Sequence, residues 1–350
     1  MSIQTSLFFY FSDQMNQSKN NPLVSIVMPA YNAENHIHEC LNSIIRQSYT
    51  NWELSIVDDF SSDRTWEIVQ SFSKKDHRIR LFKNTNKGII PALRLAFKKS
   101  SGEYITRMDA DDIMKTTKIE TLLKIPTDHN TSCVTNYVEY FSDGKLQGGF
   151  IRYANWLNGL IDKKAHWKAI YQECVIPSPS WMMSRDLFES IGAFQSDRYP
   201  EDYDLCFRLY EAKIPVIGIP QVLHLWRDHP TRASRNDPNY MDQHFIDLKL
   251  HYFEKLDLDN SKTLYLWGGG PTGKKLAKKL IDRNIVFRWC TGNQSKVGKH
   301  IYGIKIEKEE VLLSSDKKQI IFAIKQPEFV NENQLFDKIS SSSHQLFRFY

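Results

Sequence analysis

Residues 23–59 read LVSIVMPAYNAENHIHECLNSIIRQSYTNWELSIVDD. A short apolar run rich in β-branched residues opens this segment at 23–29, and a second such run closes it at 52–59. Between the two runs, apolar side chains recur at the spacing of one helix face: Ile37, Leu41, Ile44 and Ile45. A strand, a helix and a second strand in this order predict two parallel strands joined by a crossover helix.

The same alternation continues to residue 108. It predicts further helices at 64–75 and 89–100 and further strands at 79–84 and 103–108. The fold class is therefore α/β, with a mostly parallel sheet that carries helices on both faces. Ligands of such sheets bind beyond the carboxyl ends of the strands. Two acidic groups fall at such ends: residues 58–59 and residues 109–112.

The rest of the chain divides into further parts. Residues 133–230 lose the alternation and gain aromatic residues and prolines, which predicts a substrate-facing half with an irregular backbone. Strand–helix alternation resumes at Thr263 and predicts a second, small Rossmann-like α/β domain. We expect a disordered N-terminal extension at 1–21, of which the first 14 residues are alternatively an artefact of start-site choice. The other expected parts are a first domain at 22–238, a helical segment with a linker at 239–262, and the second domain at 263–350.

Composition narrows the class of protein. The chain has 350 residues, of which 41% are hydrophobic, and its net charge of +5 gives no indication of a nucleic-acid partner. Five cysteines without a CxxC pair favour a reducing compartment and argue against structural zinc. No apolar run approaches the roughly 20 residues of a transmembrane helix. We therefore expect a cytoplasmic protein, with peripheral association at the inner face of a membrane left open.

The acidic run at residues 109–112 has two interpretations. In the first, Asp112 caps a following helix and its acidic neighbours favour the positive helix end. That interpretation accounts for one carboxylate rather than three. In the second, the carboxylates bind Mg²⁺ or Mn²⁺, since such ions take one or two carboxylates together with substrate phosphates.

Two other acidic pairs also have two interpretations each when they are considered alone. The pair at 58–59 suits either hydrogen bonds from a nucleobase or ribose, or an Asx turn before a helix. Glu201 and Asp202 begin a predicted helix. They are either first-turn acids that complement the helix dipole, or a general base and its supporting carboxylate.

Taken together and in order, these segments resemble the family-2 glycosyltransferases with the GT-A fold. Residues 22–65 resemble the N-terminal signature of that family. SGEYITRMDADD at 101–112 resembles its metal-binding DxD element, and PEDYDLCFRL at 200–209 resembles its base motif. The resemblance runs from about residue 22 to about residue 235.

This resemblance implies a role for each candidate residue. Asp111 would be the direct metal ligand, and Asp202 the catalytic base, oriented by Glu201. His229 would contact the metal or the diphosphate. The nucleotide-sugar donor would lie against Pro29, Tyr31, Asp58, Asp59, Lys87, Arg94 and Asp109. For His229, Lys87 and Arg94, an ordinary surface or helix position is the alternative.

The activity implied by the resemblance is a metal-dependent, inverting sugar transfer by a hexosyltransferase. The donor would be a UDP-sugar, the acceptor a hydroxyl of a saccharide or lipid-linked saccharide, and the setting surface polysaccharide or lipopolysaccharide synthesis. The alternative is a non-catalytic scaffold that binds the nucleotide sugar. A sugar-1-phosphate nucleotidyltransferase is disfavoured, because MPAYNAEN at 28–35 lacks a glycine-rich loop with a basic residue.

The second domain carries GGGPTG at 268–273, between a predicted strand and helix. This spacing is that of a dinucleotide-binding loop. The next strand, however, runs into CTGNQSKVG at 290–298, without the acidic residue that ribose recognition needs. We therefore do not expect the second domain to bind NAD or another nucleotide. We expect a structural or protein-docking domain, and a homo-oligomer formed through this domain is left open.

Overall fold

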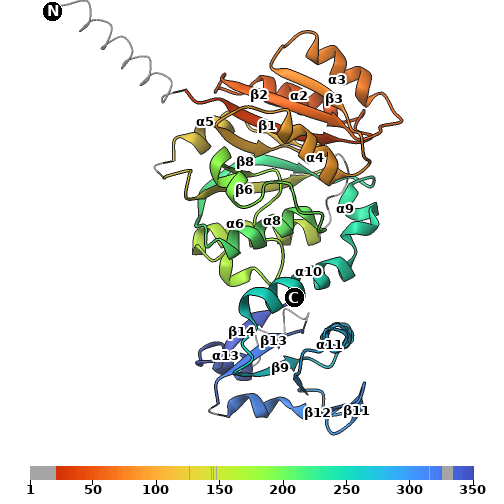
Figure 1. Cartoon of the computed structure of the whole chain (residues 1–350), viewed down its shortest axis with the longest axis vertical. Coiled ribbons are helices and arrows are strands. Elements are labelled where there is room, and N and C mark those ends of the chain that lie inside the picture. The colour runs from red at the N-terminus through yellow and green to blue at the C-terminus, as the bar shows by residue number, and fades with distance from the viewer. Residues whose placement is uncertain are drawn as a thin grey trace, which may run out of the picture. The chain divides into compact units, whose positions relative to one another are not determined.

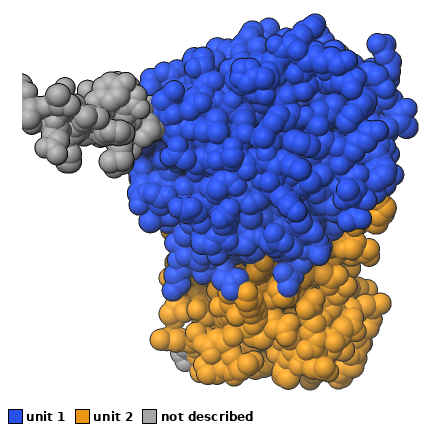
Figure 2. Space-filling view, turned by 45° about the horizontal axis from the view of Figure 1, so that its top comes forward, with its two compact units in different colours: residues 1–166, 175–236 blue, residues 167–174, 237–350 orange. Residues whose placement is uncertain are grey.

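The computed structural model describes residues 21–350 except 126, 143, 145, 147, 315 and 325–333. The predicted extension at 1–21 therefore lies outside the described residues, apart from Asn21. Contacts divide the chain into two compact units (Figure 2). The first comprises Met1–His166 and Val175–Asn236, and the second comprises Trp167–Cys174 and Asp237–Tyr350. Each unit is described by itself.

The first unit is built on an eight-stranded sheet in the order β3-β2-β1-β4-β7-β6-β8-β5 (Figure 1). The four strands predicted from the sequence are parallel: β1 (Val24–Ala30), β2 (Trp52–Asp58), β3 (Ile79–Lys83) and β4 (Tyr104–Arg107). Three helices follow the first three of them: α2 (Ile37–Ile45), α3 (Thr65–Ser73) and α4 (Ile89–Lys98). The predicted α/β class and the mostly parallel sheet are confirmed.

Buried apolar residues explain why these strands lie in the middle of the sheet. All seven residues of β2 are buried, and so are six of the seven in β1. Helices α2 and α4 each bury apolar side chains, with Ile37, Leu41 and Leu93 all fully buried. A strand covered on both faces needs such a continuous apolar run.

Residues 133–230 are more regular than their sequence suggests. Their described residues form three strands, three α-helices and a 3-10 helix at Trp167–Ala169: β6 (Cys133–Phe141), α6 (Gly148–Lys163), β7 (Trp181–Ser184), α7 (Arg185–Ser190), α8 (Glu201–Glu211) and β8 (Val216–Arg227). β7 is antiparallel to its neighbours, and a two-residue strand, β5 (Ile113–Met114), pairs with β8. The strands were not anticipated because β6 and β8 are paired only with partners distant in the sequence. Of the six prolines in this range, Pro177 and Pro179 lie in the loop before β7, and Pro220 lies within β8.

The second unit has a six-stranded sheet in the order β11-β12-β10-β9-β13-β14. Its strands are β9 (Thr263–Trp267), β10 (Arg288–Thr291), β11 (His300–Ile301), β12 (Ile304–Lys308), β13 (Lys318–Phe322) and β14 (Gln345–Arg348). All pairs are parallel except β11 with β12. The main helices are α10 (Asp242–Tyr252), α11 (Pro271–Asp282) and α13 (Gln334–Ser340). A second α/β sheet therefore exists, as the sequence predicts.

Packing accounts for part of the GGGPTG sequence at the start of α11. A Cβ on Gly273 would lie 1.9 Å from the backbone oxygen of Gly268, so no side chain fits there. Gly268 itself has φ +138°, a conformation that side chains rarely adopt. These glycines allow helix α11 to approach the end of β9 closely.

In the part of the chain that the structure describes, no helix combines the length and the apolar character needed to cross a membrane.

Candidate active site

The loops after β1 and β2 meet at the carboxyl ends of these two strands. Backbone N–H groups of the loop after β1 donate to side chains of the loop after β2. Asn32 N–H bonds to Ser61 Oγ at 3.0 Å, and Glu34 N–H bonds to Asp63 Oδ2 at 3.0 Å. These hydrogen bonds fix the two loops to each other. The Asp59 N–H also donates to Ala30 O at 2.8 Å, so Tyr31 directly follows the residue that is bonded to the acidic pair at 58–59.

The two carboxylates of this pair have different surroundings. Both oxygens of Asp59 accept the Gly88 N–H, at 2.9 and 3.0 Å, and Oδ1 also accepts Asn84 Nδ2 at 2.7 Å. Asp59 thus holds the loop after β3. Asp58 Oδ2 accepts the Ser61 N–H at 3.3 Å, but its buried Oδ1 has no partner among the described residues. An unpartnered buried acceptor is costly unless a ligand donates to it.

The same two loops carry exposed aromatic residues, Tyr31 after β1 and Phe60 after β2. Tyr31 is 52% exposed, and Lys87 Nζ lies 5.3 Å from the centroid of its ring. Phe60 is also 52% exposed and has φ +63°. A bulky residue at positive φ is an outlier that often marks a functional site. Phe60 was not anticipated from the sequence, although a large side chain within the turn DDFSS was its signal.

The remaining predicted donor residues lie in two places. Pro29 lies in β1, paired with Val57 of β2, near the end of the strand. Arg94 lies in α4, and its three hydrogen bonds go to residues 194–197. The structure therefore brings Pro29 together with Tyr31 and the acidic pair, whereas Arg94 is used to hold another loop.

The carboxylate turn (residues 109–112) follows β4. Asp109 Oδ1 pairs with Arg107 Nε at 2.8 Å, and its Oδ2 accepts Ser178 Oγ at 3.3 Å. Asp112 does not cap a helix, because β5 follows it directly and the next helix, α5 (Lys118–Leu123), starts later.

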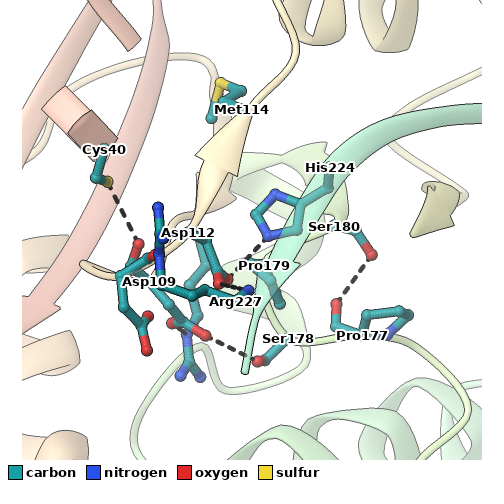
Figure 3. A network of polar contacts seen from close by, with 12 residues as sticks. Cys40, Asp109, Asp112, Met114, Pro177, Ser178, Pro179, Ser180, His224 and Arg227 are labelled. Atoms are coloured by element: carbon teal, nitrogen blue, oxygen red, sulfur yellow. Dashed lines mark hydrogen bonds and ion pairs between the residues drawn. The ribbon is translucent and has the colours of Figure 1, made fainter. Parts of the chain in front are cut away.

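Asp112 is instead satisfied inside the protein. Its Oδ2 lies 2.9 Å from His224 Nε2, and its Oδ1 accepts the Arg227 N–H at 2.8 Å (Figure 3). Burial raises the pKa of Asp112 well above its usual value, and the charges of Asp111 and Asp109 raise it further. Asp109 and Asp112 thus each hold two protein groups.

Asp111 differs from its neighbours because its partner is a histidine from a distant loop. Its Oδ2 lies 2.8 Å from His229 Nε2, although the two residues are 118 positions apart. The two side chains are 21% and 16% exposed. Burial opposes ionisation of Asp111, but the hydrogen bond with His229 and the charge of Arg232 outweigh it and lower the pKa. A carboxylate and an imidazole that meet in this way suit a divalent cation.

No group of three or more potential metal ligands exists among the described residues. Asp111 and His229, which meet here, provide two candidate ligands. That number fits Mg²⁺ or Mn²⁺ bound together with substrate phosphates, rather than an ion held by protein groups alone.

The predicted base lies at the start of α8. Asp202 borders a small pocket with mainly apolar neighbours: Ile176, Ser178, Trp181, Leu205, Cys206 and Leu209. Burial raises the pKa of Asp202 to about 7, and the charge of Glu201 raises it while that of Arg107 lowers it. A carboxyl group with a pKa near neutrality is suited to proton transfer.

Arg107 connects the two acidic groups. Its side chain is only 6% exposed, and it pairs with Asp109 at 2.8 Å and with Glu201 at 2.9 Å. The carboxylate turn and the start of α8 therefore lie on the two sides of one buried guanidinium. Arg107 was not anticipated from the sequence, because its partner in α8 is 94 positions away.

Sequence comparison gives concordant relatives. Residues 25–192 match the model of "Glycosyl transferase family 2". An uncharacterised glycosyltransferase of Rickettsia typhi is 30% identical over 299 residues, which span 79% of this chain and 90% of that protein. The chain belongs to glycosyltransferase family 2. The glycosyltransferase GlyG of Streptococcus pneumoniae is 29% identical over 226 residues, 61% of this chain and 74% of GlyG.

A further relative has a more specific name. It is the Escherichia coli UDP-Glc:alpha-D-GlcNAc-diphosphoundecaprenol beta-1,3-glucosyltransferase WfgD. WfgD is 39% identical over 130 residues, which span 37% of this chain and only 51% of WfgD. The aligned part thus covers about half of that relative.

Solved structures support the GT-A fold of this family-2 enzyme. Staphylococcus aureus TarS in complex with UDP-GlcNAc matches with a TM-score of 0.54 and 16% identity, over 73% of this chain and 71% of that chain. The Pyrobaculum calidifontis mannosyltransferase PcManGT, in complex with GDP-Man and Mn²⁺, matches with a TM-score of 0.51 and 19% identity, over 76% and 69%. The predicted family and fold are confirmed.

Proposed function

We propose that this family-2 glycosyltransferase moves a sugar from a UDP-sugar to a hydroxyl of a saccharide or lipid-linked saccharide, with inversion and with the help of Mn²⁺ or Mg²⁺. The observation that carries the proposal is the arrangement around Arg107, which joins the carboxylate turn to a helix that begins with a poised base. The relative WfgD, named for UDP-glucose and a diphosphoundecaprenol-linked acceptor, supports the donor and acceptor classes.

The side chains of the site have separate roles in this reaction. Asp111 and His229 would hold the cation, which when bound supplies positive charge to neutralise the leaving diphosphate. Asp202 accepts the proton of the acceptor hydroxyl as that hydroxyl attacks the sugar. Glu201 and Asp109 remain tied to Arg107 and are not available as nucleophiles. A single base, with the neighbouring carboxylates of Asp109 and Glu201 both held by Arg107, supports one displacement with inversion.

The first experiment is a calorimetric titration of the wild-type chain with UDP, GDP, CDP and dTDP, each with and without Mn²⁺. We expect UDP to bind most tightly, and only weakly when Mn²⁺ is left out. Binding of GDP in preference to UDP would contradict the proposed donor. Tight binding of UDP without turnover of any UDP-sugar would favour the scaffold alternative, in which the nucleotide site is kept and catalysis is lost.

Phe60 provides a separate test of the donor site. Replacing Phe60 with glycine removes a side chain from a left-handed conformation that costs roughly 1–2 kcal/mol, so the fold should not be weakened. Affinity for UDP should nevertheless fall about tenfold, because stacking of a base on an aromatic ring contributes about 1–3 kcal/mol. Calorimetry and thermal melting measure the two effects. Phe60→Tyr, which keeps the ring, is the control, and unchanged affinity in Phe60→Gly would rule out stacking.

A further inference from the structure

Lys118 is a lysine with no exposed surface. Lys118 is the first residue of α5, a six-residue helix whose other buried residues, Ile119 and Leu122, are apolar. Fully buried lysines are rare because the amine must find acceptors that replace water. An apolar side chain would fill this position of the helix equally well. The acceptors that Lys118 reaches therefore indicate its purpose.

One acceptor leads to the carboxylate turn. Lys118 Nζ lies 3.3 Å from His224 Nδ1, and His224 Nε2 lies 2.9 Å from Asp112 Oδ2. If an Nζ–H donates to Nδ1, the ring hydrogen must be on Nε2, which then donates to Asp112. Lys118, His224 and Asp112 are all fully buried. The lysine thus fixes the orientation of the imidazole that holds Asp112.

The other acceptor belongs to the Pro–Ser loop (residues 176–180). Lys118 Nζ donates to Pro179 O at 2.5 Å. The neighbouring Ser178 donates to Asp109 Oδ2, and Ile176 and Ser178 border the pocket of Asp202. Figure 3 shows Ser178 and Pro179 on one side of Asp112 and His224. Lys118 therefore contacts the loop that borders the base.

We propose that Lys118 is a positioning residue that fixes the position of the Pro–Ser loop relative to the carboxylate turn. It touches neither donor nor acceptor, and it acts through His224 on Asp112 and through Pro179 on the loop. This inference rests on the donor site proposed above. Because groups that orient the residues of a metal site change metal affinity by about 10–100-fold when they are removed, its loss should weaken the Mn²⁺-dependent part of UDP binding.

The test uses Lys118→Met, which has a similar length and no hydrogen-bond donor. In calorimetric titrations with UDP, we expect the affinity gained on adding Mn²⁺ to fall about tenfold. Affinity for UDP without Mn²⁺ should remain, because residues 29–60 are not held by Lys118. Lys124→Met, at the exposed end of the same helix, is the matched control and should behave as wild type.

A pair of variants at His224 makes the test independent of how well Lys118→Met folds. His224→Gln keeps a donor for Asp112 and an acceptor for Lys118, so it should retain most of the Mn²⁺-dependent gain. His224→Leu removes both and should lose about tenfold. Equal gains in these two variants, at equal thermal stability, would overturn the proposal.

A third comparison tests the coupling to the loop. Ser178→Ala should weaken the Mn²⁺-dependent gain by itself, but it should add little to Lys118→Met, because residues that act through one network are not additive. Fully additive losses would overturn the link to the loop. A wild-type chain without Mn²⁺-dependent UDP binding would overturn the proposed function and this inference with it. An unchanged gain in Lys118→Met, with normal wild-type binding, would overturn this inference alone.

Discussion

Asp202→Asn is expected to lower the rate of sugar transfer by about 10²–10⁴-fold, which is the usual contribution of a general base. The amide keeps the size of the carboxyl group but does not take up a proton, and the Arg107–Glu201 ion pair stays in place. Affinity for UDP with Mn²⁺ should therefore be close to that of wild type. Initial rates with a UDP-sugar and calorimetry with UDP measure the two properties. A variant that transfers sugar at the wild-type rate would remove Asp202 from the mechanism.

The pH dependence of transfer follows from the same carboxyl group. The base works only when deprotonated, and burial raises the pKa of Asp202 to about 7. The rate should therefore be low in acid and rise through a midpoint near pH 7. Glu201→Gln removes a negative neighbour that raises this pKa, so the midpoint should move to lower pH. A flat profile across this range would contradict the assignment.

The sequence predicts those features that depend on neighbours along the chain. The apolar runs at 23–29 and 52–59 suffice for the central strands, because any strand covered on both faces must be apolar throughout. The start of α8 at Glu201 agrees with its acidic first turn. The candidate carboxylates could be named because short motifs carry them. The partners of these carboxylates in the fold could not be predicted from such motifs.

The missing part of the site consists of contacts between distant residues. Arg107, Lys118 and His224 are ordinary residues in the sequence, and each acquires its role from a partner about a hundred positions away. Asp59 shows the same limit. Its position at a strand end suggests a ligand contact, yet its oxygens hold Gly88 and Asn84. Which acceptor remains for a ligand depends on which ones the fold has already used.

Asp111→Ala is expected to abolish the Mn²⁺-dependent part of UDP binding while metal-free binding persists. The reason is that the three carboxylates of the carboxylate turn have different partners. Asp109 is held by Arg107 and Ser178, and Asp112 by His224 and the Arg227 N–H. Asp111 alone in this turn faces His229. Loss of a charged ligand should lower Mn²⁺–UDP affinity by more than the roughly 10–100-fold seen for supporting groups.

Two further variants show whether the metal uses this pair of residues. His229→Ala should also weaken Mn²⁺-dependent binding, but less than Asp111→Ala, because a dication gains more from a carboxylate than from a neutral imidazole. Asp186→Asn, at an exposed position in the first turn of α7, is the control for loss of a negative charge. If Asp111→Ala kept the Mn²⁺-dependent gain, the cation would have to be bound by other groups. In that case the partners of Asp109 and Asp112 would have to rearrange to free those carboxylates for it.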